Sequence, residues 1–447
     1  MSPPDTIAAI ATAPGRAGIG VVRISGARLA EFARRLVIAE LRPRQATLVD
    51  IYDEDQSVMD KGLALFFPAP YSYTGEDVLE LQGHGGPVVL QSVLRRCLDL
   101  GARLAEPGEF TRRAYLNNKL DLAQAESVVD LIDASTVQAA RCAVRSLEGA
   151  FSERIDALSG SLTELRVLVE ATLDFPEEDI DALDREDVAK RLAALLTELA
   201  GIERASKQGS LLREGMHIVL AGQPNVGKSS LLNRLAGQEL AIVTEIPGTT
   251  RDAIRQSINL EGVPAHVIDT AGLRESADPV ERLGVERTWA SIEKADVVLV
   301  VMDARTGETG AERDILDRLP TAVPQVWVMN KIDLVRHSTA RLEQQSRYPR
   351  IWLSAKTGDG VELLRRALLK TGGWEGNHEG LFMARERHMR ALSATQAHLR
   401  RAERAMGQPE LMAEELRLAQ TELGSITGQV TADDLLGEIF ARFCVGK

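Results

Sequence analysis

The spacing of apolar residues predicts a mixed α+β domain at the start of the chain. Residues 1–118 hold short apolar runs, such as 20–24 and 62–66, which are separated by turn residues. A helix is expected to follow Gly86 and Pro87. This combination of short runs and one helix is typical of a domain with its own sheet.

In the rest of the chain, two regions whose apolar residues have helical spacing flank a region in which apolar runs alternate with helical stretches. In the first, the acidic segment 176–187 is the clearest break between two long helices. In the alternating region, apolar runs and helical stretches predict a mostly parallel sheet covered by helices. The glycine-rich segment 371–377 has the composition of a linker, and helical spacing returns over 381–447. The expected domains are residues 1–118, 119–214, 215–370 and 371–447, where the second and fourth form one helical domain that the third interrupts.

Composition and charge narrow the class of protein. The 447 residues carry a net charge of −12, which argues against a general nucleic-acid binder. Three distant cysteines predict a reducing compartment without disulfides. No apolar stretch approaches a membrane span, and the N-terminus lacks the features of a secretory signal. We therefore expect a cytoplasmic protein that does not associate with membranes.

One basic cluster stands out against this acidic background. A solvated helix face is the simpler explanation for it, and contact with RNA is the alternative. Its members are Arg385, Arg387, His388, Arg390, His398, Arg400, Arg401 and Arg404.

Residues 222–229 read GQPNVGKS and have the features of a phosphate-binding loop. An apolar run precedes them and a helical run follows, which predicts a strand, a loop and a helix. Backbone N–H groups of such a loop point at the β- and γ-phosphates of a nucleotide, near the helix N-terminus. Lys228 adds positive charge, and the Ser229 hydroxyl can bind Mg²⁺.

Two further segments, GTTRD and DTAG, have the composition of nucleotide-dependent switch regions. Thr250 in the first is the natural second ligand of Mg²⁺. Asp269 in the second fits the acidic position that holds Mg²⁺ through the next strand, and Gly272 can offer its N–H to the γ-phosphate.

The segment NKID at 330–333 predicts that the base is guanine. The Asp333 carboxylate can accept two N–H donors from guanine, and adenine offers no such pair on that edge. SAK at 354–356 completes five segments in a fixed order. Together they predict a protein that binds and hydrolyses GTP.

Leu273 follows DTAG, where many small GTPases carry the glutamine that orients the attacking water. Leucine cannot form a hydrogen bond, so another group must place the water and neutralise charge in the transition state. Arg274, Glu275, Glu281 and Arg282 lie near in sequence. Spacing alone explains each as a solvated loop charge.

The GTPase segments alone are common to many GTPases, but the chain carries further distinctive segments. They are APGRAGIG at 13–20, RISG at 23–26, YTGED at 73–77, QGHGGP at 82–87, PGEFT at 107–111, NKLDLAQAE at 118–126, GSLLREG at 209–215 and FCVGK at 443–447. With these segments, the chain resembles the MnmE (TrmE) family of tRNA-modification GTPases over essentially its whole length.

The resemblance implies an activity and partners. Members modify carbon 5 of the wobble uridine of certain tRNAs, giving aminomethyl- or carboxymethylaminomethyl-uridine. They work with a flavoprotein partner, MnmG (GidA), which carries FAD, in a heterotetramer. A methylene-tetrahydrofolate supplies the one-carbon unit, and 5-formyl-tetrahydrofolate is the related ligand. The N-terminal domain resembles the folate-binding fold of aminomethyltransferases and forms a homodimer, and K⁺ stimulates GTP hydrolysis as the GTPase units pair.

The resemblance also suggests how the missing glutamine is replaced. Asn225, Thr244, Ile246 and Thr249 match positions that bind K⁺, which can play the electrostatic part of an arginine finger. Glu281 matches the glutamate that orients the water, so Glu281 and Lys228 are the expected catalytic residues. The expected contacts with GTP or GDP are Asn225, Val226, Gly227, Lys228, Ser229, Ser230, Thr244, Glu245, Ile246, Pro247, Gly248, Thr249, Thr250, Asp269, Thr270, Ala271, Gly272, Asn330, Lys331, Asp333, Ser354, Ala355 and Lys356.

A second set of residues matches contacts with the folate. These are Arg23, Glu80, Lys119 and the terminal Lys447. A carboxylate can accept two N–H donors from a pterin ring, and cations can bind a glutamate tail. Without the resemblance, each would be read as part of a surface ion pair. Cys444 is either a reactive thiol near this site or a small packing residue, and a prenyl anchor is rejected because Gly446 and Lys447 do not fit the motif.

Two other classes of function stay open at this point. One is a ribosome-assembly GTPase, a switch without modification chemistry, which the folate-like segments argue against. The other is a membrane-remodelling GTPase, which is disfavoured because no basic amphipathic or lipid-inserting stretch is found.

Overall fold

The computed structural model divides the chain into two compact units. It describes residues 5–174, 185–237, 255–269, 295–308, 323–344, 348–376, 380–429, 433–441 and 443–446. The first unit comprises Met1–Val129, Ile155–Arg166 and Ala413–Lys447, and the second comprises Asp130–Arg154 and Val167–Met412. Each unit therefore collects segments that are far apart in the sequence.

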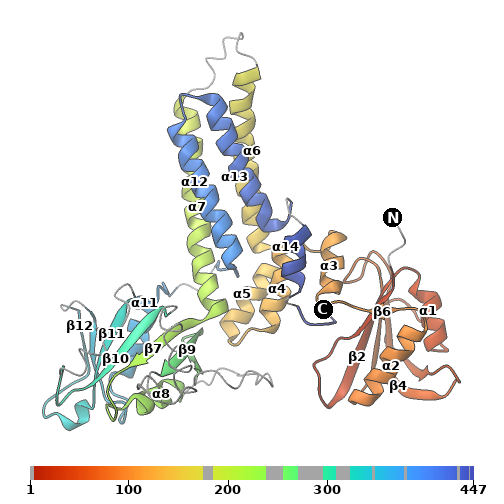
Figure 1. Ribbon diagram of the computed structural model, residues 1–447, viewed down its shortest axis with the longest axis horizontal. Coiled ribbons are helices and arrows are strands. Elements are labelled where there is room, and N and C mark those ends of the chain that lie inside the picture. Colours follow the sequence, from red (N-terminus) through yellow and green to blue (C-terminus); the bar gives the residue numbers. More distant parts are fainter. Residues whose placement is uncertain are drawn as a thin grey trace, which may run out of the picture. The chain divides into compact units, whose positions relative to one another are not determined.

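A six-stranded sheet forms the base of the first unit (Figure 1). The strands run in the order β3-β4-β5-β2-β1-β6, and all neighbouring pairs are antiparallel except β1 with β6. Helices α1 and α2 pack on one face, where alternate strand residues such as Ile24, Leu79 and Leu81 are buried. The elements are β1 (Ile7–Ile10), β2 (Ala17–Gly26), α1 (Leu29–Leu36), β3 (Thr47–Tyr52), β4 (Val58–Phe67), β5 (Asp77–Gly85), α2 (Pro87–Asp99) and β6 (Arg103–Leu104).

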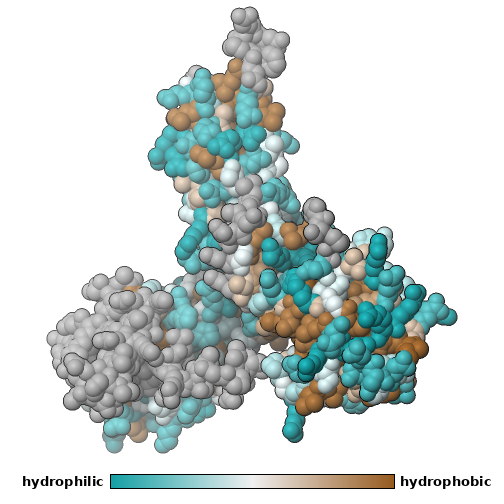
Figure 2. Space-filling view, turned by 45° about the vertical axis from the view of Figure 1, so that its right-hand side comes forward, coloured by the Kyte–Doolittle hydropathy of each residue, from teal (hydrophilic) through white to brown (hydrophobic). Residues whose placement is uncertain are grey.

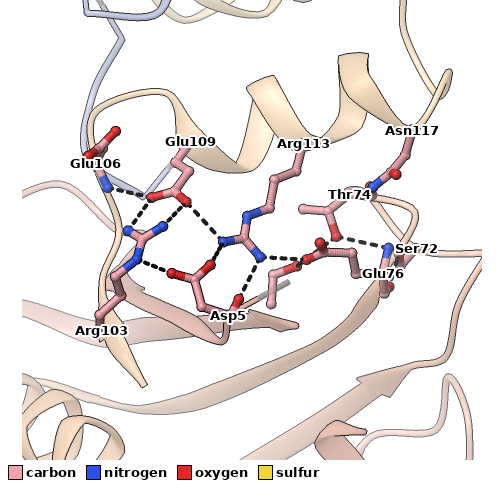
Figure 3. A network of polar contacts seen from close by, with 10 residues as sticks. Asp5, Ser72, Thr74, Glu76, Arg103, Glu106, Glu109, Arg113 and Asn117 are labelled. Atoms are coloured by element: carbon pink, nitrogen blue, oxygen red, sulfur yellow. Dashed lines mark hydrogen bonds and ion pairs between the residues drawn. The ribbon is translucent and has the colours of Figure 1, made fainter. Parts of the chain in front are cut away.

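Helix α3 (Glu109–Leu116) is fixed to the same sheet by a network of charged side chains (Figure 3). Arg113 donates to Glu109 at 2.9 Å, to Glu76 at 2.9 Å and to Asp5 at 2.8 Å. Arg103 pairs with both Asp5 and Glu109. Because every buried carboxylate here faces a guanidinium group, the charges can be held under the helix.

The C-terminal segment belongs to the first unit. Leu122 and Ala125 of α4 pack against Phe440 and Phe443. At Gly446, with φ near 97°, a Cβ atom would lie 2.5 Å from the carbonyl oxygen of Ile10, so only glycine fits this close approach to β1. Four helices have all or part of their length in this unit: α4 (Leu122–Ile132), α6 (Ala150–Asp174), α13 (Pro409–Thr427) and α14 (Asp433–Phe440). The parts of α4, α6 and α13 outside the bounds given above belong to the second unit.

A seven-stranded sheet forms the centre of the second unit. Its order is β12-β13-β11-β10-β7-β9-β8, and the pairs are parallel except β8 with β9 and β12 with β13. Every residue of β10 is buried, as expected of a parallel strand covered on both faces. The elements are β7 (Met216–Ala221), α8 (Lys228–Ala236), β8 (Arg255–Leu260), β9 (Val263–Asp269), β10 (Val297–Asp303), β11 (Gln325–Asn330), β12 (Arg341–Glu343), β13 (Arg350–Trp352) and α11 (Val361–Thr371), with a 3₁₀ turn at Ile332–Leu334.

Helices that precede and follow the strands of this sheet in the sequence contribute residues to its core. Ala139 and Cys142 of α5 lie in the same buried cluster as β7 and β9. Thr136 caps α5 by accepting from the N–H of Ala139, and its hydroxyl donates to Gly262 in the β8–β9 turn at 2.8 Å. The remaining helices are α5 (Val137–Leu147), α7 (Arg185–Glu214) and α12 (Glu386–Arg404). The expected fold class, a sheet-containing N-terminal domain with a mostly parallel P-loop sheet inserted among helices, is confirmed.

Asp130 joins the two points at which the chain enters and leaves the inserted sheet. Its carboxylate accepts from Arg213, two residues before Gly215, at 3.0 Å and from Arg385 at 2.8 Å. The side chain of Asp130 is 5% exposed. Carboxylate and guanidinium groups therefore hold the end of α7 and the start of α12 together.

The segment expected to be a linker is packed against α7. Helix α11 extends to Thr371, and Trp374 is buried in the core of the second unit. Gln208 donates to the carbonyl oxygen of Gly373 at 2.7 Å and accepts from the N–H of Glu375 at 2.9 Å. One buried tryptophan and two hydrogen bonds therefore hold this glycine-rich segment.

Within the described part of the chain, no helix is both long enough and apolar enough to cross a membrane. Figure 2 shows hydrophilic residues over much of the visible helical surface, with hydrophobic residues scattered among them. Scattered hydrophobic residues of this kind are normal on protein surfaces.

Replacing Asp130 by alanine should destabilise the second unit by about 3 kcal/mol or more, because two guanidinium groups lose a nearly buried carboxylate. Urea unfolding should show the loss. Asp133→Asn is the matched control. Burial and the nearby charge of Asp130 raise the pKa of Asp133, so a neutral residue there should leave stability unchanged or slightly higher. Equal stability of Asp130→Ala and wild type would contradict this role.

Candidate functional site

The loop between β7 and α8 has a backbone that only particular residues can adopt. Gly222 has a φ near 149°, and a Cβ atom there would lie 2.3 Å from the carbonyl oxygen of Val301. Gly227 has a φ near 97°, and a Cβ atom would lie 2.4 Å from the Asn330 amide nitrogen. Between them, Asn225 is left-handed with a φ near 63°. Both glycines are thus needed for the wrapped loop that can surround a phosphate.

Lys228 begins helix α8 and lies inside this loop. Its ammonium donates to the carbonyl oxygens of Gly222 at 2.7 Å and Gln223 at 3.0 Å. The residue is 8% exposed, while Ser229 and Ser230 after it are exposed. The positive charge and the helix N-terminus therefore coincide, which favours an anionic ligand here.

Asn330 connects the phosphate loop with the SAK loop at 354–356. Its amide nitrogen donates to the carbonyl oxygen of Val226 at 2.8 Å, and its amide oxygen accepts from the N–H of Ala355 at 2.9 Å. The residue is 2% exposed. One buried amide thus fixes the distance between segments that are about one hundred residues apart in the sequence.

Lys331 is held by an acidic residue that the sequence analysis did not single out. Its ammonium donates to Asp303 at 2.9 Å and to the carbonyl oxygen of Asn225 at 2.6 Å. Arg305 binds the same carboxylate with two nitrogens, and its hydrogen bonds, together with Lys331, hold the pKa of Asp303 well below its ordinary value. The signal available in the sequence was the position of Asp303 at the end of the apolar run 297–302.

The loop expected to recognise the base is also preorganised. Ser354, which is buried, donates to one oxygen of the Asp333 carboxylate at 2.6 Å. Arg234 of α8 donates to the carbonyl oxygens of Ala355 at 3.2 Å and Lys356 at 2.6 Å. Arg234 is a second residue that the sequence analysis missed, because its helical position alone indicated only a surface cation.

Many of the expected site residues lie outside the described part of the chain. They are Thr244, Glu245, Ile246, Pro247, Gly248, Thr249, Thr250, Thr270, Ala271, Gly272, Glu281 and Lys447. Asp269 is described only by its backbone at the end of β9, opposite Leu220 of β7. Their roles stay predictions.

A second polar site lies in the first unit, on the sheet face opposite α1 and α2. Arg23 of β2 and Glu80 of β5 are paired in register and form an ion pair at 2.8 Å. The Arg23 guanidinium lies over the Tyr73 ring and donates to the carbonyl oxygen of Gly446 at 3.4 Å. Both charged side chains are 17% exposed. The structure therefore brings two of the expected folate contacts to the residue that precedes Lys447.

Lys119 and Cys444, also singled out for this unit, have separate contacts. Lys119 donates to the carbonyl oxygen of Pro70 at 3.2 Å and lines a cavity of about 520 Å³ together with Asp121 and Asp156. Cys444 is exposed, and its carbonyl oxygen accepts from the N–H of Gly108 at 3.4 Å. The Cys444 side chain is thus accessible, as a reactive thiol would need to be.

The fold and the loops define a P-loop GTP-binding protein, because a wrapped phosphate loop meets an NKID loop and an SAK loop at the ends of parallel strands. The family model described as the MnmE helical domain matches residues 122–444, and the one described as the GTP-binding protein TrmE N-terminus matches residues 6–119. The chain belongs to the MnmE family of tRNA modification GTPases.

Relatives of full length support this assignment. The tRNA modification GTPase MnmE of Dechloromonas aromatica is 60% identical over 447 residues, which cover 99% of each chain. The protein of the same name from Nitrosomonas europaea is 59% identical over 452 residues, which cover 100% of each. Among solved structures, Era of Aquifex aeolicus is 25% identical over 41% of this chain and 66% of that chain, with a TM-score of 0.28, too low to support an argument.

Asp333→Asn should shift binding from GTP towards xanthosine triphosphate. With one carboxylate oxygen held by Ser354, the amide nitrogen takes the place of the other oxygen and donates where guanine needs an acceptor. We expect GTP affinity to fall by about 100-fold or more and xanthosine triphosphate affinity to rise. Equilibrium binding of both nucleotides would measure this, with Asp359→Asn in the adjacent loop as control. Unchanged GTP affinity would remove Asp333 from base recognition.

Proposed function

We propose that this chain is a K⁺-stimulated GTP hydrolase that acts with a flavoprotein partner of the MnmG type. The pair modifies carbon 5 of the wobble uridine in certain tRNAs, with a reduced folate as the source of one carbon. The observation that carries this proposal is the full-length identity with proteins named tRNA modification GTPase MnmE, which includes the N-terminal unit as well as the nucleotide site.

The residues of the phosphate loop fit GTP with Mg²⁺. Lys228 and the N–H groups of the loop would bind the β- and γ-phosphates, and Asp333 would bind guanine. Ser229 and Thr250 would bind Mg²⁺, with Asp269 holding the ion from the next strand. Bound Mg²⁺ supplies positive charge between the phosphates. The wrapped loop backbone and the positive helix end support this arrangement.

K⁺ and Glu281 would replace the missing glutamine. Asn225 lies exposed at the tip of the phosphate loop, and we assign it to K⁺ together with Thr244, Ile246 and Thr249. Oxygen ligands of this kind suit a hard monovalent ion. Glu281 would hold and orient the attacking water through its carboxylate. Hydrolysis would accompany pairing of two GTPase units.

Arg23 and Glu80 fit a reduced folate. Glu80 presents a carboxylate that is oriented by Arg23 and only partly exposed, as needed to accept two N–H donors from a pterin ring. We assign Lys119 and Lys447 to the same ligand, which would be methylene- or 5-formyl-tetrahydrofolate. Bound folate supplies the one-carbon unit, and these residues would bind and orient it. Cys444 would be a reactive thiol beside the site.

The assembly would be a homodimer through the N-terminal domain, joined by two copies of the partner, which carries FAD. We place the domains at residues 1–118, 119–214, 215–370 and 371–447, and the protein in the cytoplasm. GTP-dependent pairing would displace the helices on either side of the inserted domain.

GTP hydrolysis should be at least about tenfold faster in K⁺ than in Na⁺ at matched ionic strength, because a K⁺ ion neutralises charge in the transition state. Asn225→Ala should abolish this difference and leave GTP affinity within a few-fold of wild type. Gln223→Ala is the matched control, because its carbonyl oxygen still accepts from Lys228. Equal rates of the wild type in both salts would exclude a K⁺ site.

Glu80→Gln should weaken binding of 5-formyl-tetrahydrofolate by about 10- to 100-fold, because an amide replaces the charged acceptor. Isothermal titration calorimetry on the full chain would measure the affinity. Asp50→Asn is the matched control, since Asp50 forms an exposed ion pair with Lys61 on the same sheet. If the wild type bound no reduced folate, the proposed function would fail and a switch in ribosome assembly would become the better reading.

A further inference from the structure

His84 and Asp60 form a hydrogen-bonded pair on the sheet of the first unit. The Nδ1 atom of His84, on β5, lies 2.7 Å from Oδ1 of Asp60, on β4. The backbone N–H of His84 donates to Oδ2 of the same carboxylate at 2.8 Å. The Asp60 side chain is 8% exposed and the His84 side chain 73% exposed. A nearly buried carboxylate therefore orients a largely exposed imidazole.

The local sequence makes room for this pair. A Cβ atom on Gly83 would lie 2.2 Å from Oδ2 of Asp60, so a side chain at this position would displace the carboxylate. A Cβ atom on Gly62 would lie 2.2 Å from the carbonyl oxygen of Gln82, so a second glycine permits the close approach of β4 and β5. Glycine at positions 62 and 83 thus leaves room for the Asp60 carboxylate beside His84, and a larger residue at either position would not.

The Asp60 carboxylate is charged at neutral pH. Burial alone would raise its pKa, but hydrogen bonds from the side chain and backbone of His84 and from the backbone of Lys61 outweigh burial and hold the pKa below its ordinary value. Lys61, the next residue, is paired with Asp50 at 3.4 Å. Asp60 is therefore the acceptor that selects which ring nitrogen of His84 carries hydrogen.

This geometry equips His84 to accept a proton. When an ionised carboxylate accepts from Nδ1–H, the lone pair of the imidazole is left on Nε2. After Nε2 takes a proton, the same carboxylate stabilises the imidazolium ion, as in dyads of a histidine and an aspartate that act as general bases. Asp60 is the positioning residue and His84 the residue that would exchange the proton.

His84 also lies on the strand that carries Glu80. His84 lies four positions after Glu80, which corresponds to about 13 Å at the usual rise of a strand. A ligand that binds at Arg23 and Glu80 and extends along β5 would reach the imidazole. The pair therefore lies on a strand that also contributes to the site that we assign to the reduced folate.

We propose that His84 is the general base that activates the amine substrate of the modification, an inference that rests on the proposed function. The aminomethyl group of the proposed product contains a new carbon–nitrogen bond, so the proposed reaction consumes an amine, which is protonated at neutral pH. The R–NH₃⁺ group must therefore lose a proton before its nitrogen can bond to carbon. That proton moves to Nε2 of His84, which leaves R–NH₂ with a free lone pair and an imidazolium ion held by Asp60.

The state of the imidazole can be tested without turnover. Nuclear magnetic resonance of the full chain labelled with ¹⁵N-histidine contains signals from seven histidines, and His84→Gln identifies the one from His84. We expect Nδ1 to carry hydrogen and Nε2 to carry none at a pH where the ring is neutral. Asp60→Asn should reverse or mix the two forms. An Nε2–H form of His84 in the wild type would overturn the proposal.

The reaction itself gives a second test. With the flavoprotein partner, tRNA, folate and ammonium, His84→Gln should slow modification by about 100-fold at neutral pH. Binding of 5-formyl-tetrahydrofolate and the thermal midpoint should stay unchanged. The deficit should shrink at higher pH, where more of the amine is unprotonated, and on addition of imidazole. Lys61→Gln is the control for disturbance of β4 and should modify tRNA at the wild-type rate.

The outcomes separate this proposal from the proposed function. A wild type that neither binds folate nor supports modification would refute the proposed function and His84's role with it. A wild type that modifies tRNA while His84→Gln keeps its rate would overturn the role of His84 alone. Loss of folate binding in His84→Gln would make the residue a binding residue, which also overturns the role of a base.

Discussion

The two connections of the inserted sheet in the second unit share a single carboxylate. Asp130 accepts from Arg213, where α7 is about to enter the inserted sheet, and from Arg385, where the chain begins α12. An insertion is held most firmly when both of its connections are fixed. A nearly buried ion pair meets this condition through charge and geometry together, and the hydrogen bonds of Gln208 to residues 373 and 375 add a second fixed point.

Within the inserted sheet, Asn330 joins separate segments as Asp130 does at the two connections. Its amide connects the phosphate loop to the loop of Ala355, and Lys331 connects the same phosphate loop to Asp303. The segments that would bind the base and the phosphates therefore share one set of hydrogen bonds. A preorganised site of this kind loses less free energy on ordering when a ligand binds.

The sequence predicted those features that local spacing determines. The strand 297–302, the strand–loop–helix around Lys228 and the helix after Pro87 follow from short-range patterns of apolar residues, glycine and proline. Partners that are distant in the sequence could not be predicted. Asp130 and Arg385 are separated by 255 residues, and no local pattern identifies such a pair. The packing of the segment expected to be a linker could not be predicted for a related reason, since the burial of Trp374 depends on tertiary contacts.

The turn between β8 and β9 is held against helix α5. Thr136 donates to Gly262 in this turn, and a Cβ atom on Gly262 would lie 2.5 Å from Gln138. The turn is therefore held against the start of α5, and the core of the sheet continues into that helix. The strands on either side lead in sequence to the segments of Thr250 and Gly272. Because their shared turn is fixed to a helix, β8 and β9 cannot shift at this end without moving α5 or breaking the hydrogen bond between Thr136 and Gly262.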